Sequence, residues 1–165
     1  MTAQTIRQQK GFTLIELLVV IGILAILLAI TLIAINPARQ FGQANDTNRR
    51  SSVTQILNSI GQYTASNGGV LPTVLSDRAD DPLLQDVALE LASTTAYAPL
   101  CALLVPTYLP ALPVDPELGD SEGVESTECG GAWDTGYLIS IDAQNRITVS
   151  ADQDYVYEGP IEVTR

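Results

Sequence analysis

The sequence contains no histidine and only one lysine (Lys10), and each of these shortages argues against a class of function. Histidine is the usual general base near neutral pH and the commonest transition-metal ligand, so most catalytic and metal-centre hypotheses lose their main residue. The chain has 8 basic against 19 acidic residues. Nucleic-acid affinity comes mainly from lysine and arginine neutralising phosphates. We therefore expect neither an enzyme nor a nucleic-acid-binding protein.

A long apolar run near the N-terminus is what the sequence does contain. Phe12–Ile35 has 24 residues, and Glu16 is its only charged one. Such a helix is roughly 36 Å long, against a hydrocarbon core of about 30 Å. Arg7 and Lys10 precede the run, and no basic residue follows before Arg39. The positive-inside rule thus predicts one membrane span with a cytoplasmic N-terminus and an extracytoplasmic head.

Two simpler interpretations of this run are a secretory signal and a plain signal anchor. A secretory signal has an apolar region of about 7–15 residues and a small-x-small cleavage site, whereas this run is longer and ends at Ile35-Asn36-Pro37. A plain signal anchor explains the span and its orientation. It gives no role to Glu16, whose charge costs about 2.5 kcal/mol or more at the bilayer centre and less near an interface. The signal-anchor interpretation stays open, but it leaves the charge on Glu16 unexplained.

One short segment resembles the class III leader junction of type IV prepilins and pseudopilins, and it reads Gly11-Phe12-Thr13-Leu14-Ile15-Glu16-Leu17-Leu18. The resemblance implies cytoplasmic-face cleavage after Gly11, N-methylation of Phe12 and packing of the apolar helix into a filament core. It also implies that Glu16 pairs with the new Phe12 amine, within its own chain or in a neighbouring subunit. A wrong axial offset would leave a buried unpaired charge, so the intermolecular pair would set the register of assembly.

The resemblance implies a function and a set of partners. The leading hypothesis is a structural subunit of a type IV pilus, and the alternative is a pseudopilin of a type II secretion or DNA-uptake (competence) system. The implied partners are identical or related pilin subunits, the prepilin peptidase/N-methyltransferase, the assembly platform and the inner membrane. The subunit would cross the cytoplasmic membrane once before joining an extracellular pilus or a periplasmic pseudopilus. An adhesive tip subunit and an anchored enzyme are rival classes.

The sequence divides into four parts: a leader (1–11), a transmembrane and filament-core helix (12–35), the amphipathic half of a long helix (36–67) and a head (68–165). Pro37 is suited to begin a helix, because its missing N–H costs nothing there. A glycine costs about 1 kcal/mol and a proline about 3 inside a helix, so a break between Gly22 and Pro37 is the alternative to a continuous helix.

The head has the pattern of an α+β fold, with the long helix packed against a small antiparallel sheet. Apolar residues recur at helical spacing at Val53, Ile56, Leu57, Ile60 and Tyr63. Asn67-Gly68-Gly69 then predicts the end of the helix. Alternation over 137–141 and 147–149 predicts a hairpin, and Tyr155–Glu158 and Ile161–Thr164 predict one or two further strands.

The middle of the head has a short helical pattern followed by a proline-rich stretch. Asp81 followed by Pro82 and by apolar residues at helical spacing predicts a short helix over Pro82–Ala92. Five prolines between Ala98 and Pro116 predict interrupted structure. Within that stretch, Leu112–Pro116 resembles the LPxDP loop of many pilin and pseudopilin heads.

Cys101 and Cys129 both fall on the side of the membrane that the topology makes extracytoplasmic, where disulfides form. A bridge across their separation of 28 residues would contribute about 3–4 kcal/mol in the chain-entropy model. Two free thiols and a metal site remain alternatives. The family resemblance favours the disulfide, because many pilins close a C-terminal loop in this way.

An acidic loop directly precedes Cys129, with carboxylates at Asp115, Glu117, Asp120, Glu122, Glu125 and Glu128. Oxygen ligands of this kind suit calcium, and some pseudopilins bind calcium in the corresponding region. Asp115 and Asp120 are the candidate ligands, and no other cofactor is expected. The alternative is a solvated acidic loop without metal.

Two further groups have both a structural and a functional interpretation. Arg49 and Arg50 either contact an acidic patch on a neighbouring head or form a solvated helix face. The second group either forms an aromatic binding surface or fills a small core, and consists of Tyr97, Tyr108, Trp133, Tyr137, Tyr155 and Tyr157.

Overall fold

The structure is a computed structural model that describes residues 11–34, 36–118, 123–151 and 161–165. It divides into two compact units that meet between Ala38 and Arg39. The first unit holds helix α1 (Leu14–Ala34), and the second holds nearly all of α2 (Pro37–Ser66) and everything after it. We describe each unit by itself.

Helix α1 is apolar on every side and runs through Gly22 without a break. A second helix, α2, begins at Pro37, which confirms proline as the helix start. Proline disfavours helical geometry in the residue before it and lacks an N–H donor. The boundary between the two helices therefore falls just before Pro37, and Gly22 is tolerated inside α1.

The long helix α2 packs one face into the head. Its predicted core positions Val53, Ile56, Leu57 and Ile60 are all buried. After Ser66 the helix ends at the predicted glycines, where Gly68 has φ 69° and Gly69 has φ 90°. Positive φ values are accessible to glycine without steric cost, so this pair reverses the chain.

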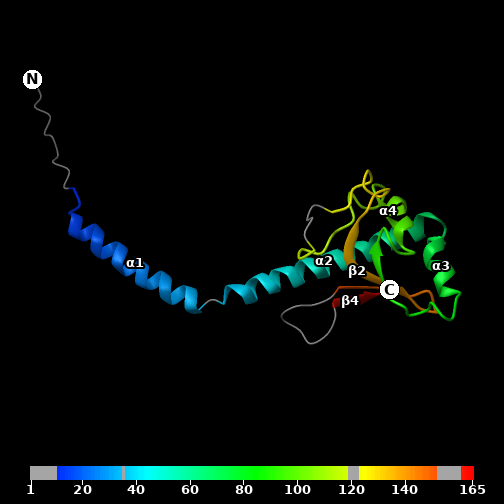
Figure 1. Ribbon diagram of the computed structural model, residues 1–165, viewed down its shortest axis with the longest axis horizontal. Coiled ribbons are helices and arrows are strands. Elements are labelled where there is room, and N and C mark those ends of the chain that lie inside the picture. The colour runs from blue at the N-terminus through cyan, green and yellow to red at the C-terminus, as the bar shows by residue number, and fades with distance from the viewer. Residues whose placement is uncertain (1–10, 35, 119–122, 152–160) are drawn as a thin grey trace, which may run out of the picture. The chain divides into compact units, whose positions relative to one another are not determined.

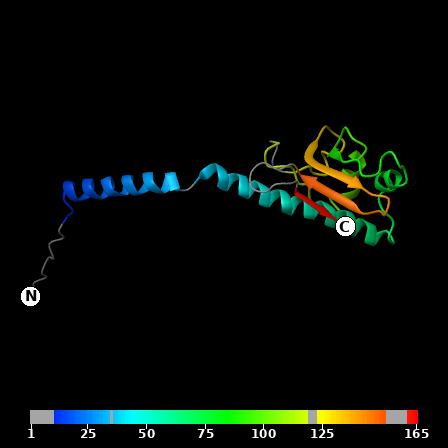
Figure 2. The same ribbon diagram turned by 90° about the horizontal axis from the view of Figure 1, so that it is seen from below.

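A four-stranded antiparallel sheet packs over α2 in the order β1-β2-β3-β4 (Figures 1 and 2). Its strands are β1 (Leu89–Ala92), β2 (Asp134–Ile141), β3 (Ile147–Ala151) and β4 (Ile161–Thr164). The predicted hairpin is confirmed, with Ile139 paired to Val149. Buried residues alternate along β2 and β3, so one face of the sheet joins the core. The predicted α+β class is confirmed.

The helix predicted over Pro82–Ala92 is wrong. A turn begins at Asp81, whose Oδ1 accepts a hydrogen bond from the Leu83 N–H at 2.9 Å. Asp86 then adopts φ 59°, which is incompatible with continuing a right-handed helix, and its N–H donates to the Ile141 carbonyl. The residues after it pair with β2 as strand β1. Tertiary pairing with β2 thus overrides the local helical spacing.

Two short helices were not predicted. Helix α3 (Thr73–Ala79) follows the glycine turn, and α4 (Ala98–Leu104) lies in the proline-rich stretch. Pro99 falls in the first turn of α4, where proline is tolerated. The strand predicted over Tyr155–Glu158 lies outside the described residues.

Candidate functional site

The start of α1 is held by a reciprocal contact between Thr13 and Glu16. The Thr13 N–H and its hydroxyl donate to Glu16 Oε2 at 2.7 and 2.8 Å, and the Glu16 N–H donates to the Thr13 hydroxyl at 3.3 Å. This is a capping box, in which both side chains satisfy backbone donors that the first helical turn leaves unpaired. Glu16 therefore has a partner, Thr13, in its own chain, and its pairing with the Phe12 amine stays a prediction.

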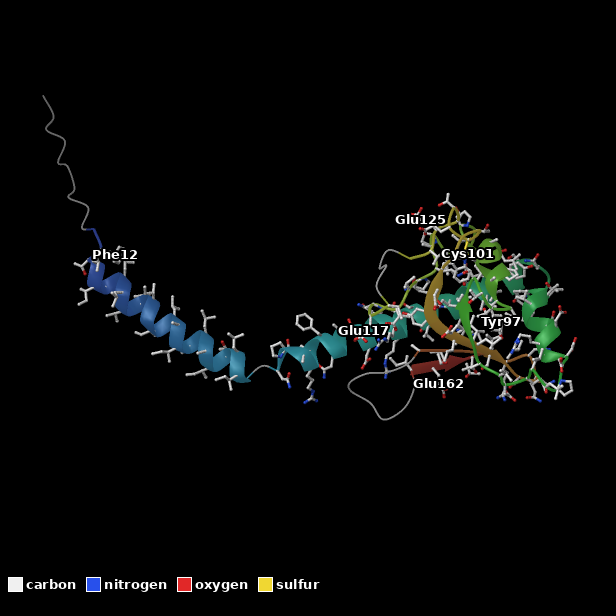
Figure 3. All side chains as sticks on the ribbon, in the orientation of Figure 1. Phe12, Tyr97, Cys101, Glu117, Glu125 and Glu162 are labelled. Carbon is white, nitrogen blue, oxygen red and sulfur yellow. A yellow bond between two sulfur atoms is a disulfide. The ribbon has the colours of Figure 1, made fainter. Side chains whose placement is uncertain are left out.

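Helix α1 exposes its apolar side chains, as far as the described residues show. Side chains from Leu14 to Ile33 are all exposed, and Phe12 just before them is 84% exposed (Figure 3). The segment Leu14–Ile33 has a mean hydropathy of 2.9, long and apolar enough to cross a membrane on length and composition.

A buried ion-pair cluster joins α2 to the acidic loop of the head. Arg49 donates to both carboxylate oxygens of Asp115, from Nε to Oδ2 at 2.6 Å and from Nη2 to Oδ1 at 3.0 Å. The same guanidinium lies 3.5 Å from Asp46 Oδ1 and 3.2 Å from Glu117 Oε2. The hydrogen bond to Asp115 raises the pKa of Arg49, although burial opposes the shift. The guanidinium therefore stays charged in every accessible pH range.

Asp115 is anchored to the sheet as well as to the helix. Its N–H donates to the Thr135 carbonyl of β2 at 2.9 Å. Gly136 lies next to this contact and has φ 71°. A Cβ atom at this position would collide with the Leu118 side chain and would lie 3.1 Å from the Asp115 Cβ. The glycine thus lets the loop that contains Asp115 lie directly on β2.

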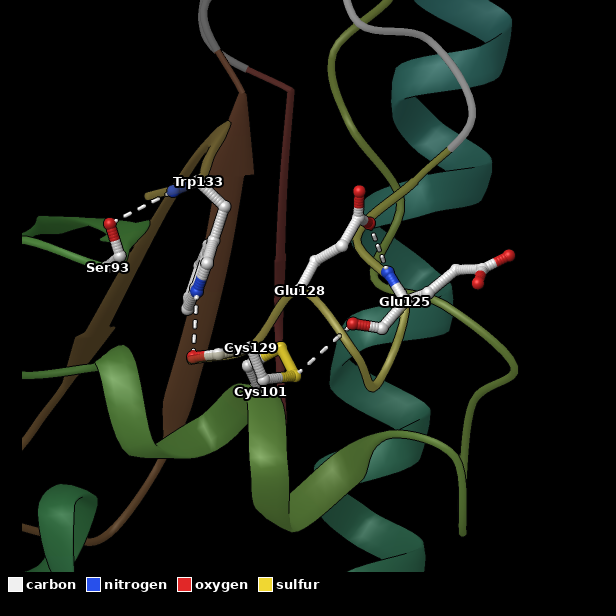
Figure 4. The surroundings of a disulfide bond; sticks show 6 residues. All are labelled: Ser93, Cys101, Glu125, Glu128, Cys129 and Trp133. Atoms are coloured by element: carbon white, nitrogen blue, oxygen red, sulfur yellow. Dashed lines mark hydrogen bonds between the residues drawn. A yellow bond between two sulfur atoms is a disulfide. The ribbon is translucent and has the colours of Figure 1, made fainter. Parts of the chain in front are cut away.

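The two cysteines form a disulfide between α4 and the end of the acidic loop, with their Cα atoms 5.5 Å apart (Figure 4). Trp133 follows the bridge and donates from its indole Nε1 to the Cys129 carbonyl at 3.3 Å. Its backbone N–H donates to the Ser93 hydroxyl at 3.0 Å. Glu128 accepts from the Glu125 N–H at 2.8 Å. The bridge and these bonds hold the loop end between α4 and the sheet.

Most of the aromatic residues that the structure describes fill the core instead of forming a surface. Tyr97 and Tyr137 are fully buried, and Trp133 is 9% exposed. Burial raises the pKa of both of these tyrosines. Tyr63 and Tyr108 meet edge to face with ring centroids 5.8 Å apart. The packing interpretation therefore accounts for these residues.

A family model described as the prokaryotic N-terminal methylation motif matches residues 6–32. The N-terminal segment of the chain therefore has the methylation motif of pilin-like prepilins. The match spans the junction of Gly11 and Phe12 and includes Glu16. Comparisons with curated proteins and with solved structures found no match. The pilin-type family consists of structural subunits, and a match to this N-terminal segment leaves open which assembly the chain enters.

The structure places the predicted cleavage residues ahead of the first helix. Gly11 and Phe12 are exposed and non-helical, and α1 begins two residues after Phe12. The capping role of Thr13 was missed, although Thr-x-x-Glu before an apolar run is its sequence signal. Cleavage and methylation at this junction remain predictions.

The acidic loop does not present both of its predicted calcium ligands as available carboxylates in the described residues. The Asp115 carboxylate is engaged by Arg49, and Asp120 lies outside the described residues. Among the residues that the structure describes, no three acidic or cysteine side chains are grouped to hold a metal ion. Calcium binding stays a prediction.

Arg49 is buried within its own head, so the hypothesis that it contacts a neighbour or solvent was wrong.

Proposed function

We propose that this prepilin is a structural subunit of a type IV pilus. In this account, prepilin peptidase removes residues 1–11, Phe12 becomes the N-methylated terminus, and mature subunits polymerise through α1. Before assembly, the subunit crosses the cytoplasmic membrane once with its head outside. The methylation motif over residues 6–32 is the observation that carries the proposal.

The exposure of α1 supports polymerisation through this helix. Its large apolar side chains are exposed by amounts from 51% at Val19 to 86% at Ile33. Removing apolar surface from water is favourable by about 25 cal/mol per Å², so this helix must be covered in any stable state. Lipid covers it in the membrane, and the α1 helices of neighbouring subunits would cover it in a fibre.

The geometry of Glu16 is compatible with a second partner in the fibre. Both hydrogen bonds from Thr13 end on Oε2. A carboxylate offers about four acceptor positions on its two oxygens. Because the side chain is exposed, Oε1 remains accessible to the Phe12 amine of a neighbouring subunit. The capping contact and the intermolecular pair are therefore compatible.

A pseudopilin is the second candidate, favoured by the loop that resembles LPxDP. In this chain the loop is Leu112–Pro116, and Leu112 is fully buried while Asp115 is bound to Arg49. A loop held this rigidly is suited to present a fixed surface, which either kind of fibre can use. The two candidates differ in the length and location of the fibre.

Immunogold electron microscopy of the native host, with an antibody against the head, distinguishes these candidates. The pilus proposal expects labelled fibres extending from the cell surface, together with a processed subunit. A short labelled fibre confined to the periplasm would favour the pseudopilin. Label confined to membranes, with no fibre of either kind, would contradict both.

A further inference from the structure

Thr13 is the residue at which helix α1 begins. Its carbonyl accepts the first helical hydrogen bond, from the Leu17 N–H at 3.3 Å. Thr13 itself is non-helical, and α1 runs from Leu14. A non-helical residue whose carbonyl already belongs to the helix is an N-cap. The cap therefore follows directly on Phe12, the first residue after the predicted cleavage bond.

The cap uses two N–H groups that a longer helix would direct to residues before Thr13. In an α-helix, each N–H donates to the carbonyl four residues earlier. The Glu16 N–H would therefore donate to the Phe12 carbonyl if α1 continued upstream. In the structure it donates to the Thr13 hydroxyl at 3.3 Å, and the Thr13 N–H donates to Glu16 Oε2 at 2.7 Å. These bonds replace the ones that would extend the helix across Phe12.

The predicted cleavage bond, between Gly11 and Phe12, lies outside the helical hydrogen-bond pattern. Within the described residues, no backbone hydrogen bond ends on the carbonyl of Gly11 or of Phe12. Phe12 is 84% exposed, and a Cβ added to Gly11 would meet no atom within 4 Å. The backbone of both residues is therefore accessible from outside the chain.

Hydrolysis of this bond requires such access. Water gives its hydroxyl to the Gly11 carbonyl carbon and a proton to the Phe12 nitrogen as the bond between them breaks. A peptidase stabilises the charge that develops on the carbonyl oxygen with its own donors. In a longer helix the same oxygen would already accept from the Ile15 N–H, and the helical backbone would surround the bond.

We propose that Thr13 is a positioning residue for leader removal, because its cap ends the helix before the Gly11–Phe12 bond. The inference rests on the proposed function and specifies how its cleavage step is prepared. Thr13 does not take part in the reaction. It acts through the backbone conformation of Gly11 and Phe12, which it keeps out of the helix.

Loss of the cap should lengthen the helix instead of shortening it. The cap lies at the edge of the predicted span, where an N–H without a partner is costly because the bilayer offers it no water. Extension upstream would give the Ile15 and Glu16 N–H groups the carbonyls of Gly11 and Phe12 as acceptors. The bond to be cleaved would then lie inside a helical turn.

Pulse-labelling of the full-length chain in the native host tests this role through substitutions of Thr13. Thr13→Val keeps the side-chain shape but has no capping acceptor. It should slow the removal of residues 1–11 about fivefold, the typical effect of a lost N-cap. The change is one of rate, so processed chains still accumulate with time.

Two variants and a control separate capping from recognition of the side chain by the peptidase. Thr13→Ser and Thr13→Asn supply a capping acceptor on different side chains and should keep the wild-type rate. Thr31→Val is the matched control, since the Thr31 hydroxyl donates to the Leu28 carbonyl within α1 at 2.9 Å. It should also be processed at the wild-type rate.

The carbon-13 chemical shifts of Gly11 and Phe12 in the full-length chain in detergent give an independent measure. They should move toward helical values in Thr13→Val and stay unchanged in Thr13→Ser.

Equal processing rates for Thr13→Val and Thr13→Ser, or faster processing of Thr13→Val, would overturn the positioning role and leave the proposed function intact. So would processing of Thr13→Asn as slow as that of Thr13→Val, because the peptidase would then recognise the side chain itself. A wild-type chain that keeps its leader in the native host would instead overturn the proposed function, and this inference with it.

Discussion

Arg49 and Asp115 are 66 residues apart in the sequence, and they form a bidentate ion pair with a shortest distance of 2.6 Å. Their side chains are 4% and 6% exposed. The pair connects α2 to the loop that lies on β2. Because the charges are buried, each is costly without the other. The orientation of the acidic loop on α2 therefore depends on this contact.

Removing Asp115 should destabilise the head strongly. Asp115→Ala leaves the Arg49 guanidinium buried without its main partner, and the free energy of unfolding should fall by about 3–5 kcal/mol. Denaturant titration of the full chain in detergent, followed by fluorescence of the single tryptophan Trp133, measures the loss. Asp142→Ala is the matched control. It breaks the exposed pair with Arg146 and should have a much smaller effect. Equal losses would refute the role of burial.

Much of this architecture was predictable because local signals and burial agree. Pro37, the Gly68-Gly69 pair and the alternation along β2 and β3 each have one dominant physical cause in the nearby sequence. The leader junction was predictable for the same reason, because Glu16 is the only charged residue in the apolar run Phe12–Ile35. Neighbouring residues alone are enough to identify such features.

The features that were missed depend on contacts between distant segments. Leu89–Ala92 has helical spacing with the residues before it, and only pairing with β2 makes it a strand. Arg49 looks like a surface residue beside Arg50, because its partner Asp115 is distant in the sequence. The Asp115 carboxylate looked available to a metal for the same reason. Local patterns cannot specify these pairings.

The disulfide should stabilise the head in protein from the native host. Replacing both Cys101 and Cys129 by serine should lower the free energy of unfolding by about 3–4 kcal/mol, because the unfolded chain regains the freedom of a long loop. The same tryptophan-monitored titration applies. Mass spectrometry of unreduced protein should first show two hydrogens fewer than the reduced form. Two freely alkylated thiols in native protein would refute the bridge.

The β2–β3 turn should lose stabilisation at acid pH. The carboxylate of Asp142 accepts backbone hydrogen bonds, chiefly from the Arg146 N–H, and these bonds lower the pKa of Asp142. A folded-state pKa below the unfolded value stabilises the fold above the unfolded pKa, and the contribution disappears as pH falls through the folded pKa. The difference in melting temperature between wild type and Asp142→Ala should therefore be full at pH 7 and vanish at the acid extreme. A difference that grows on acidification would contradict the assignment.

Glu16 should be required for assembly through its charge, beyond its capping role. Glu16→Gln preserves a capping acceptor for Thr13 while removing the charge. It should leave membrane insertion and leader removal largely intact and lower the ratio of filament to membrane protein as strongly as Glu16→Ala. Thr13→Ala is the converse control, since it removes the hydroxyl that caps the Glu16 N–H, keeps the carboxylate and should assemble better than Glu16→Gln. If Glu16→Gln assembles normally, the capping role alone accounts for the presence of Glu16, and its charge is not required for assembly.

The most direct test of the whole account is terminal and intact mass spectrometry of the protein in fibres purified from its native host. The account predicts a chain that begins at Phe12, carries one methyl group on its terminal amine and contains the Cys101–Cys129 disulfide. A fibre protein that retains the leader, or that begins near Asn36 as a secretory signal would require, would contradict it.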